Sequence, residues 1–205
     1  MLLGEILFTI LIMVMMLLKN KTFFDTDYLS SFLRIGRMDL VLDKYGRILI
    51  STQVKSELCA EGYSPKIRQG FIDLYNEGHV EIYEIVENTE EWDIYLNLRY
   101  ESTEDYEKNI GEMSVIALAK AKNGILASNN LNDVCVYVEE YNLEHVTTAT
   151  TLVECFKNNE ITFKEANSYW KKLHGFGIKL PKTSFENFCK LHGYPCEDFK
   201  NHKFN

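Results

Sequence analysis

Short apolar runs alternate with segments of helical periodicity along most of this chain, and this alternation is its strongest structural constraint. The apolar runs cover residues 21–25, 47–50, 80–85, 124–127 and 144–148. Between them, apolar side chains recur at the three- and four-residue spacing that is typical of amphipathic helices. Strands that alternate with helices favour a parallel sheet covered on both faces. We therefore expect an α/β fold with three layers and a five-stranded, mainly parallel sheet.

Helices are predicted between and after these strands. They cover residues 28–41, 52–58, 67–75, 92–98, 112–122, 134–141, 151–158, 163–173 and 184–192. Because only helices follow residue 148, the end of the chain reads as a helical appendage packed on the sheet domain. The predicted organisation is an apolar segment at 1–20, a sheet domain at 21–160 and the appendage at 161–205.

The charge of the chain limits how it could bind nucleic acid. The net charge of its 205 residues is −8 at neutral pH. A protein held on nucleic acid by a basic surface needs clustered Lys and Arg, so any such contact must be local here. Candidate phosphate-binding cations are Arg34, Arg37, Lys55, Lys66 and Arg68. Surface solubility is the favoured explanation for each of them when it is considered singly.

The five cysteines favour reduced thiols and a cytoplasmic location. They are widely spread and include no Cys-x-x-Cys pair, which is more typical of a reducing compartment than of a disulfide framework. Cys189, His192, Cys196 and His202 follow one another at short intervals, but without a second cysteine pair this spacing is a weak signal for zinc.

Residues 6–18 form an apolar run that is interrupted only by Thr9. It is shorter than the ~20 residues that a membrane-spanning helix needs. Three interpretations stay open: a short membrane anchor with the domain on the Lys-rich cytoplasmic side, a buried or partner-binding helix, and an extension upstream of the true start. Membrane tethering is therefore expected only through residues 1–18.

Acids and amides occur at four places where predicted strands end or helices begin. They are Asp25 and Asp27 after the first strand, Glu57 in the second helix, Glu112 after Gly111 at the start of an alanine-rich helix, and Asn130 and Asp133 after the strand at 124–127. The carboxyl ends of parallel strands meet at one edge of a sheet, so these side chains could form a carboxylate cluster that holds Mg²⁺ or Mn²⁺. Singly, each is explained equally well as a helix cap or a solvated surface residue.

The order and spacing of these four places resembles the PIN-domain nucleases, which include the VapC type of bacterial toxin. The resemblance covers residues 21–160 and includes the Gly-Glu-x-x-x-Ile-Ala-Leu-Ala start of a helix. The stretches 25–33 and 124–133 are similar to uncharacterised PIN-like proteins of Gram-positive bacteria. The resemblance implies a PIN-like fold, a Mg²⁺- or Mn²⁺-dependent endoribonuclease, an RNA substrate, an antitoxin protein as partner and a homodimer.

The resemblance also implies a role for each acid. The implied catalytic residues are Asp25, Glu57, Glu112 and Asn130, and the implied metal ligands are Asp25, Glu112, Asn130, Asp133 and Asp27. Asn130 stands where the family usually has an aspartate. An amide oxygen can ligate Mg²⁺ but brings no charge and cannot act as a base, so Asp133 or Asp27 would supply the missing carboxylate.

The departure at Asn130 leaves a second interpretation open, in which a catalytically weakened PIN-like protein binds nucleic acid or another protein. A nucleotide-binding doubly wound domain is disfavoured, because the sequence contains no Gly-x-Gly-x-x-Gly or Gly-x₄-Gly-Lys-Ser/Thr loop for phosphate.

Overall fold

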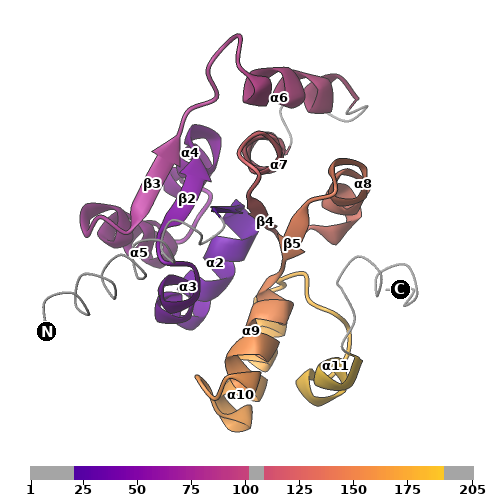
Figure 1. The fold of residues 1–205 in the computed structure, drawn as a ribbon. Helices are drawn as coiled ribbons and strands as arrows, with labels where there is room; N and C mark the ends of the chain where they lie inside the picture. Colours follow the sequence, from indigo (N-terminus) through magenta and orange to yellow (C-terminus); the bar gives the residue numbers. More distant parts are fainter. Residues whose placement is uncertain (1–20, 102–108, 192–205) are drawn as a thin grey trace, which may run out of the picture.

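The computed structural model describes residues 21–101 and 109–191, and these ranges contain a five-stranded parallel sheet (Figure 1). The strands are β1 (Thr22–Phe24), β2 (Ile48–Ser51), β3 (Val80–Tyr83), β4 (Ile125–Ala127) and β5 (Glu144–Val146). Their order across the sheet is β3-β2-β1-β4-β5, and every neighbouring pair is parallel. The predicted α/β fold is confirmed.

Helices connect the strands and continue after the last one. They are α2 (Thr26–Ile35), α3 (Met38–Tyr45), α4 (Thr52–Cys59), α5 (Pro65–Asn76), α6 (Glu90–Glu101), α7 (Ile110–Ala121), α8 (Leu131–Tyr141), α9 (Thr148–Lys157), α10 (Phe163–Gly175) and α11 (Phe185–Leu191). Figure 1 shows α7 and α8 on one face of the sheet and α3 and α9 on the other. The chain adds β2 and β3 on one side of β1 and then β4 and β5 on the other, an order that places helices on both faces of a parallel sheet.

The segment 28–41, predicted as one helix, forms two. Helix α2 ends at Ile35, and Gly36 follows with a φ of +70° while its N–H bonds to the carbonyls of Leu33 and Phe32. Glycine adopts this left-handed conformation at little cost and commonly ends helices in this way. Helix α3 then begins at Met38, so the break at Gly36 turns the chain toward β2.

Helix α9 begins three residues earlier than predicted. The side chain of Thr147 accepts a hydrogen bond from the Thr150 N–H at 3.1 Å, and the Thr150 hydroxyl accepts one from the Thr147 N–H at 2.9 Å. This reciprocal capping box fixes the helix start. The β-branched threonines favoured a longer strand in the prediction, and the cap shortens it to β5.

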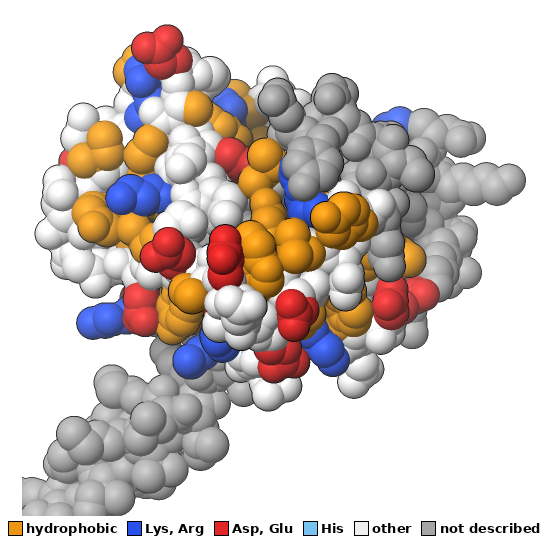
Figure 2. Space-filling model, turned by 90° about the horizontal axis from the view of Figure 1, so that it is seen from above, with side chains coloured by type: hydrophobic (Ala, Val, Ile, Leu, Met, Phe, Trp, Pro, Cys, Tyr) orange, Lys and Arg blue, Asp and Glu red, His pale blue; other side chains and the backbone are white. Residues whose placement is uncertain are grey.

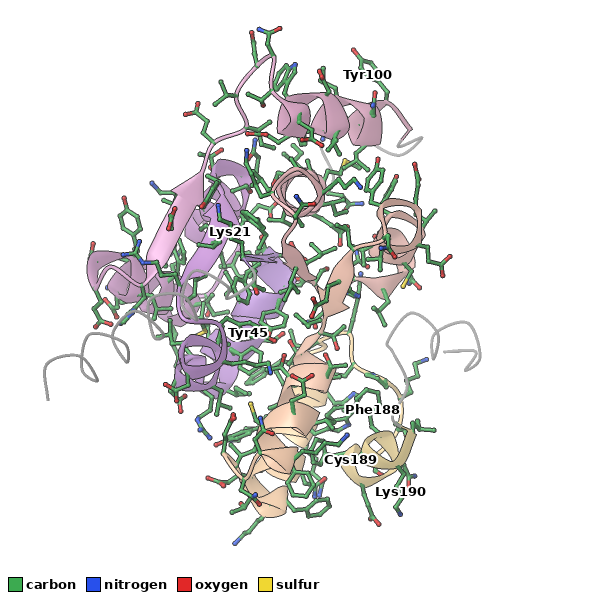
Figure 3. The ribbon with its side chains drawn as sticks, viewed as in Figure 1. Lys21, Tyr45, Tyr100, Phe188, Cys189 and Lys190 are labelled. Atoms are coloured by element: carbon green, nitrogen blue, oxygen red, sulfur yellow. The ribbon has the colours of Figure 1, made fainter. Side chains whose placement is uncertain are left out.

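A shared hydroxyl links three helices beneath the sheet. The strands β1, β2 and β4 are wholly buried, and the buried Tyr28 of α2 donates to or accepts from Thr151 of α9 at 2.8 Å. Tyr45, at the end of α3, lies 3.1 Å from the same Thr151 oxygen, between α3 and α9 in Figure 3. Thr151 therefore serves as a hydrogen-bond partner for two phenol groups, which also interact with each other.

The last two helices pack against the sheet domain through aromatic side chains. The ring of Trp170 on α10 lies 5.5 Å from that of Phe185 and 5.2 Å from that of Phe188 on α11, and Figure 3 places Phe188 at this junction. Arg37 donates to the Tyr169 hydroxyl at 2.6 Å, which joins α10 to the turn between α2 and α3. These contacts fix the segment between α10 and α11 against the domain.

The cysteines differ in state. Cys59, Cys155 and Cys189 carry free thiols, whereas Cys135 on α8 is disulfide-bonded. The prediction of reduced cysteines is wrong at Cys135, because pairing depends on which thiols the fold brings together and not on sequence spacing.

The N-terminal apolar run at 6–18 lies outside the described residues. Among the residues that are described, no helix is long and apolar enough to cross a membrane.

Replacing Thr151 by valine tests the hydroxyl link. Valine conserves the volume but leaves both phenol groups without this partner, so we expect the free energy of unfolding to fall by about 1–3 kcal/mol. Tyr45→Phe removes only one of the two bonds and should cost less. Urea denaturation measures both variants, and an equal or smaller loss for Thr151→Val would contradict the shared role.

Candidate functional site

Two buried acids from distant parts of the chain meet at one hydroxyl group. The Ser128 hydroxyl, just after β4, lies 3.2 Å from Oδ2 of Asp25 and 3.4 Å from Oε1 of Glu112. The two acidic residues are only 5% and 6% exposed. A hydroxyl has a single hydrogen and can donate to only one carboxylate at a time. When Ser128 donates to one of the two carboxylates, the other therefore receives no hydrogen bond from it.

The parallel sheet and the start of a helix hold Asp25 in position. Its main-chain N–H donates to the carbonyl of Ala127 on the neighbouring strand at 2.9 Å, which continues the pairing of β1 with β4. Its Oδ1 accepts from the Thr26 N–H at 2.6 Å, so Asp25 caps α2. One oxygen serves the cap, and the other faces Ser128 and the second acid.

The pKa of Asp25 is raised because its surroundings disfavour the ionised carboxylate. Burial is the main cause that raises it, the charges of Asp27 and Glu57 raise it further, and together they bring it to about 7 from an ordinary value of 3.8. Loss of water around an ionised carboxylate and nearby like charges both disfavour the charged form.

The pKa of Glu112 is raised well above its ordinary value for the same reasons. Burial is the largest cause, followed by the charges of Asp25 and Asp133, while a hydrogen bond from Asn130 and the charge of Lys179 act in the opposite direction. Without a cation, the two acids hold a proton far more readily than ordinary carboxylates do.

Asn130 connects the acids to a lysine. Its amide nitrogen donates to Oε2 of Glu112 at 3.1 Å and to the carboxylate of Asp133, one turn further along α8. Its Oδ1 accepts from Nζ of Lys179 at 2.6 Å. Asn130 is buried and Asp133 is exposed, so this chain of contacts runs from the buried acids to solvent.

Glu57 lies beside the pair and joins two helix starts. Its Oε1 accepts from the Gly111 N–H at 2.9 Å, and its Oε2 accepts from the Thr26 hydroxyl. Its carboxylate presses against Gly111, where an added Cβ would lie 2.5 Å from both carboxylate oxygens. A side chain at position 111 would therefore have to displace the Glu57 carboxylate, which links the beginnings of α2 and α7.

Asp27 contributes through its backbone as well as its charge. The amide nitrogen of Asn129 lies 3.3 Å from the Asp27 carbonyl and has Ser31 and Thr148 as further acceptors, which share the two hydrogens of that NH₂ group. The oxygen of the same amide accepts from the Thr148 N–H at 2.9 Å. Asn129 thus links α2, the end of β4 and the start of α9 by hydrogen bonds beside the acids.

Four residues near the acids lie outside the predicted catalytic set. They are Ser128, Tyr63, His145 and Lys179. Burial and the charges of Asp27, Glu57 and Asp25 raise the pKa of Tyr63 to about 12, which places this phenol among the carboxylates. Only Ser128 had a sequence signal, since it follows β4 directly.

His145 supports the site and carries no charge. Its Nε2 lies 2.9 Å from the carbonyl of Ser128, and burial lowers its pKa to about 4. A neutral imidazole therefore holds the end of β4 near neutral pH.

Among the described residues, the five predicted phosphate-binding cations form no ion pair with the central acid pair, although the charge of Arg34 acts on nearby Tyr63. Arg37 pairs with Asp39 at 2.8 Å, and Arg34 and Lys55 each lie over an aromatic ring. Within the described part of the chain, none of the five forms a hydrogen bond to Asp25 or Glu112. Lys179, from the segment between α10 and α11, is the cation that the structure brings to this site instead.

Asp25 and Glu112 fit a divalent cation, with the oxygen of Ser128 as a neutral donor. The predicted ligand Asn130 turns its NH₂ group to Glu112 and its oxygen to Lys179 in the structure. Mg²⁺ prefers oxygen ligands and commonly uses one or two carboxylates, leaving other positions to water and phosphate. A cation would also offset the charge that burial penalises. In residues 21–101 and 109–191, no three acid, histidine or cysteine side chains are gathered as a metal group by themselves, so the site offers a carboxylate pair.

Comparison with known proteins identifies a family. A family model described as a PIN domain matches residues 21–193. The match covers most of the chain and includes every residue of the site described above. No curated protein matches the sequence.

The raised pKa of Asp25 predicts that the metal-free protein loses stability as the pH rises. The unfolded chain releases this proton near 3.8 and the folded chain near 7, so the contribution is fully present below about pH 4 and is lost as the pH rises through 7. Asp25→Asn removes the titration. We expect it to raise the free energy of unfolding at about pH 8 on the order of 2–4 kcal/mol, with a much smaller effect at about pH 4.

Urea denaturation in EDTA at both pH values measures this effect. Asp43→Asn, which changes an exposed acid on α3, is the matched control. If the two variants are equally stable at about pH 8, burial of Asp25 does not cause the pH dependence.

The contact between Glu57 and Gly111 predicts a strong coupling between substitutions. Gly111→Ala should cost about 1 kcal/mol, because the new methyl group displaces the carboxylate from its donors. In a Glu57→Ala background the space is free, and alanine should stabilise α7 by up to ~1 kcal/mol. A double-mutant cycle measured by urea denaturation tests this; the same effect in both backgrounds would mean that Glu57 is not the obstacle.

Proposed function

This chain belongs to the PIN-domain family, and we propose that it is a metal-dependent ribonuclease whose central acids are Asp25 and Glu112. The observation that carries the proposal is the meeting of these two buried carboxyl groups at the single hydroxyl of Ser128. Such a pair is costly to ionise unless a cation is present. Two buried carboxylates that need a cation to ionise are expected in a site that binds a divalent ion for phosphodiester cleavage.

Different residues of the chain would bind the ion and orient its ligands. Asp25 and Glu112 would hold the ion, and the Asn130 amide, whose NH₂ group donates to Glu112, would orient that carboxylate. A bound Mg²⁺ or Mn²⁺ would lower the pKa of a water molecule and offset negative charge on the phosphate. The Thr26 N–H and the Ser128 hydroxyl orient Asp25, as the Asn130 amide orients Glu112.

The remaining acids have different roles in the proposal. Glu57 is a positioning residue, because both of its oxygens already accept hydrogen bonds that hold α2 to α7. Asp27 is partly exposed and Asp133 is exposed, so solvent reaches both. Either carboxylate could accept the proton that the attacking water releases.

The proposed substrate is RNA, bound locally. On the face seen in Figure 2, Lys and Arg side chains are scattered among acidic and hydrophobic ones and form no continuous basic patch. A strand held by only a few phosphate contacts agrees with the net charge of −8.

The family resemblance supports narrower proposals about partners and location. They are a role as the toxin of a toxin–antitoxin pair, an antitoxin protein as partner, a homodimer, and a cytoplasmic location. Tethering through residues 1–18 would add a membrane contact, and that segment lies outside the described residues.

A second candidate function is RNA binding without cleavage. One observation favours it: the place where the family usually has an aspartate holds Asn130, and its oxygen accepts from the Lys179 ammonium group. An amide cannot act as a base. A site weakened in this way would keep a negatively charged strand near the acids without hydrolysing it.

A metal titration of RNA cleavage tests the first proposal against the second. The full chain is incubated with a fluorescent single-stranded RNA and increasing Mg²⁺ or Mn²⁺. We expect cleavage only with the divalent ion, a loss of about 100-fold or more in Asp25→Asn and Glu112→Gln because the ion loses a ligand, and full activity in the control Asp43→Asn.

Binding of Mn²⁺, followed by the loss of its free electron paramagnetic resonance signal, gives a readout that does not depend on activity. It should weaken in the same two variants. Cleavage that persists in both Asp25→Asn and Glu112→Gln would contradict the nuclease assignment. Retained RNA binding with no cleavage under any divalent ion would favour the second candidate.

A further inference from the structure

Lys179 reaches the acid pair from a part of the fold that the predicted site did not include. It lies between α10 and α11, and its Nζ donates to Oδ1 of Asn130 at 2.6 Å. Its charge also lowers the pKa of Glu112 against the larger effect of burial. The appendage therefore delivers a positive charge to the edge of the carboxylate site.

The amide of Asn130 has one orientation that satisfies all its neighbours. Lys179 can only donate, and the carboxylates of Glu112 and Asp133 can accept. The oxygen must therefore face the lysine, and the NH₂ group must face the acids, as the structure has it. A carboxylate in this place would face two other carboxylates. Asn130 thus acts as a connector that holds a lysine beside the acids.

Lys179 is itself open to solvent and to a ligand. It is exposed and lines a cavity of about 250 Å³, together with the apolar residues Leu131, Leu180 and Pro181. The segment that carries it is anchored, because Leu180 is 8% exposed and the Trp170 indole donates to the carbonyl of Thr183 at 2.9 Å. The ammonium group is held in place without being covered.

We propose that Lys179 binds a phosphate of the RNA strand next to the acid pair, with Asn130 as the residue that positions it. This proposal rests on the proposed function, since it assigns a substrate-binding residue to the same site. An ammonium group is a common point-charge ligand for phosphate. The apolar wall of Leu131, Leu180 and Pro181 would lie against the nucleoside that the same phosphate carries.

RNA binding measured without cleavage tests the proposal. The anisotropy of a fluorescent single-stranded RNA is followed in EDTA with the full chain, at several salt concentrations. We expect Lys179→Met to weaken binding about tenfold and to reduce the salt dependence by about one phosphate contact. Lys179→Arg should restore most of the affinity because it keeps the charge.

Lys171→Met is the matched control. Lys171 is an exposed lysine on α10, so its loss removes the same charge from the protein but not from the site. Equal affinities for Lys171→Met and Lys179→Met would overturn the proposal, and so would a wild-type chain that binds no RNA. The thermal melting temperature of each variant checks that it folds.

The positioning role of Asn130 is tested by a double-mutant cycle. Asn130→Ala should weaken RNA binding severalfold in the wild-type background, because the lysine loses its anchor, and should have little further effect when combined with Lys179→Met. Independent, additive effects would overturn the positioning role.

Mn²⁺ binding separates this proposal from the proposed function. Lys179→Met should bind Mn²⁺ at least as well as wild type, because it removes a competing positive charge. If RNA affinity is unchanged in Lys179→Met while metal-dependent cleavage by the wild type is intact, only the role of Lys179 fails. If cleavage by the wild type is absent while Lys179→Met still loses RNA affinity, only the nuclease assignment fails.

Discussion

The buried pair of Asp25 and Glu112 makes demands that much of the surrounding structure meets. Two carboxyl groups removed from water and placed on one hydroxyl repel each other when ionised, so their neighbours must hold them in place. Asp25 is fixed by the pairing of β1 with β4 and by its cap on α2. Ser128 and Asn130 then complete the contacts of Glu112. The site costs stability in the metal-free chain, and that cost is the basis of its proposed affinity for a cation.

The fold could be predicted from the sequence because its signals are local. Alternating apolar runs and helical segments define the strands, and the parallel sheet places Asp25, Ser128 and Asn130 at one edge. The errors were local too: a glycine with a positive φ divided one predicted helix, and a capping box shortened a strand. Both depend on backbone geometry that composition and periodicity do not encode.

The contributions of Lys179 and Glu57 could not be predicted in the same way. Lys179 follows β4 by some fifty residues of helix and turn, and only the packing of α10 on the domain brings it to Asn130. The sequence pointed to basic residues near the first two strands, and of these Arg37 pairs with Asp39 and Lys55 lies over the ring of Tyr75. Glu57 was predicted as a catalytic acid. In the folded chain both of its oxygens accept hydrogen bonds, from Gly111 and Thr26, and the sequence carries no sign of these contacts.

Asp25, Glu112 and Asn130 each stand at the start of a different helix. Asp25 caps α2, Glu112 lies in the first turn of α7, and Asn130 precedes α8. The aligned peptide dipoles give each helix start a partial positive charge, equivalent to roughly half an elementary charge. Three such ends converge where the side chains are acidic, so the backbone supplies positive potential that no count of lysines and arginines includes. In the proposed function, this potential offsets part of the negative charge of the acids when a phosphate approaches.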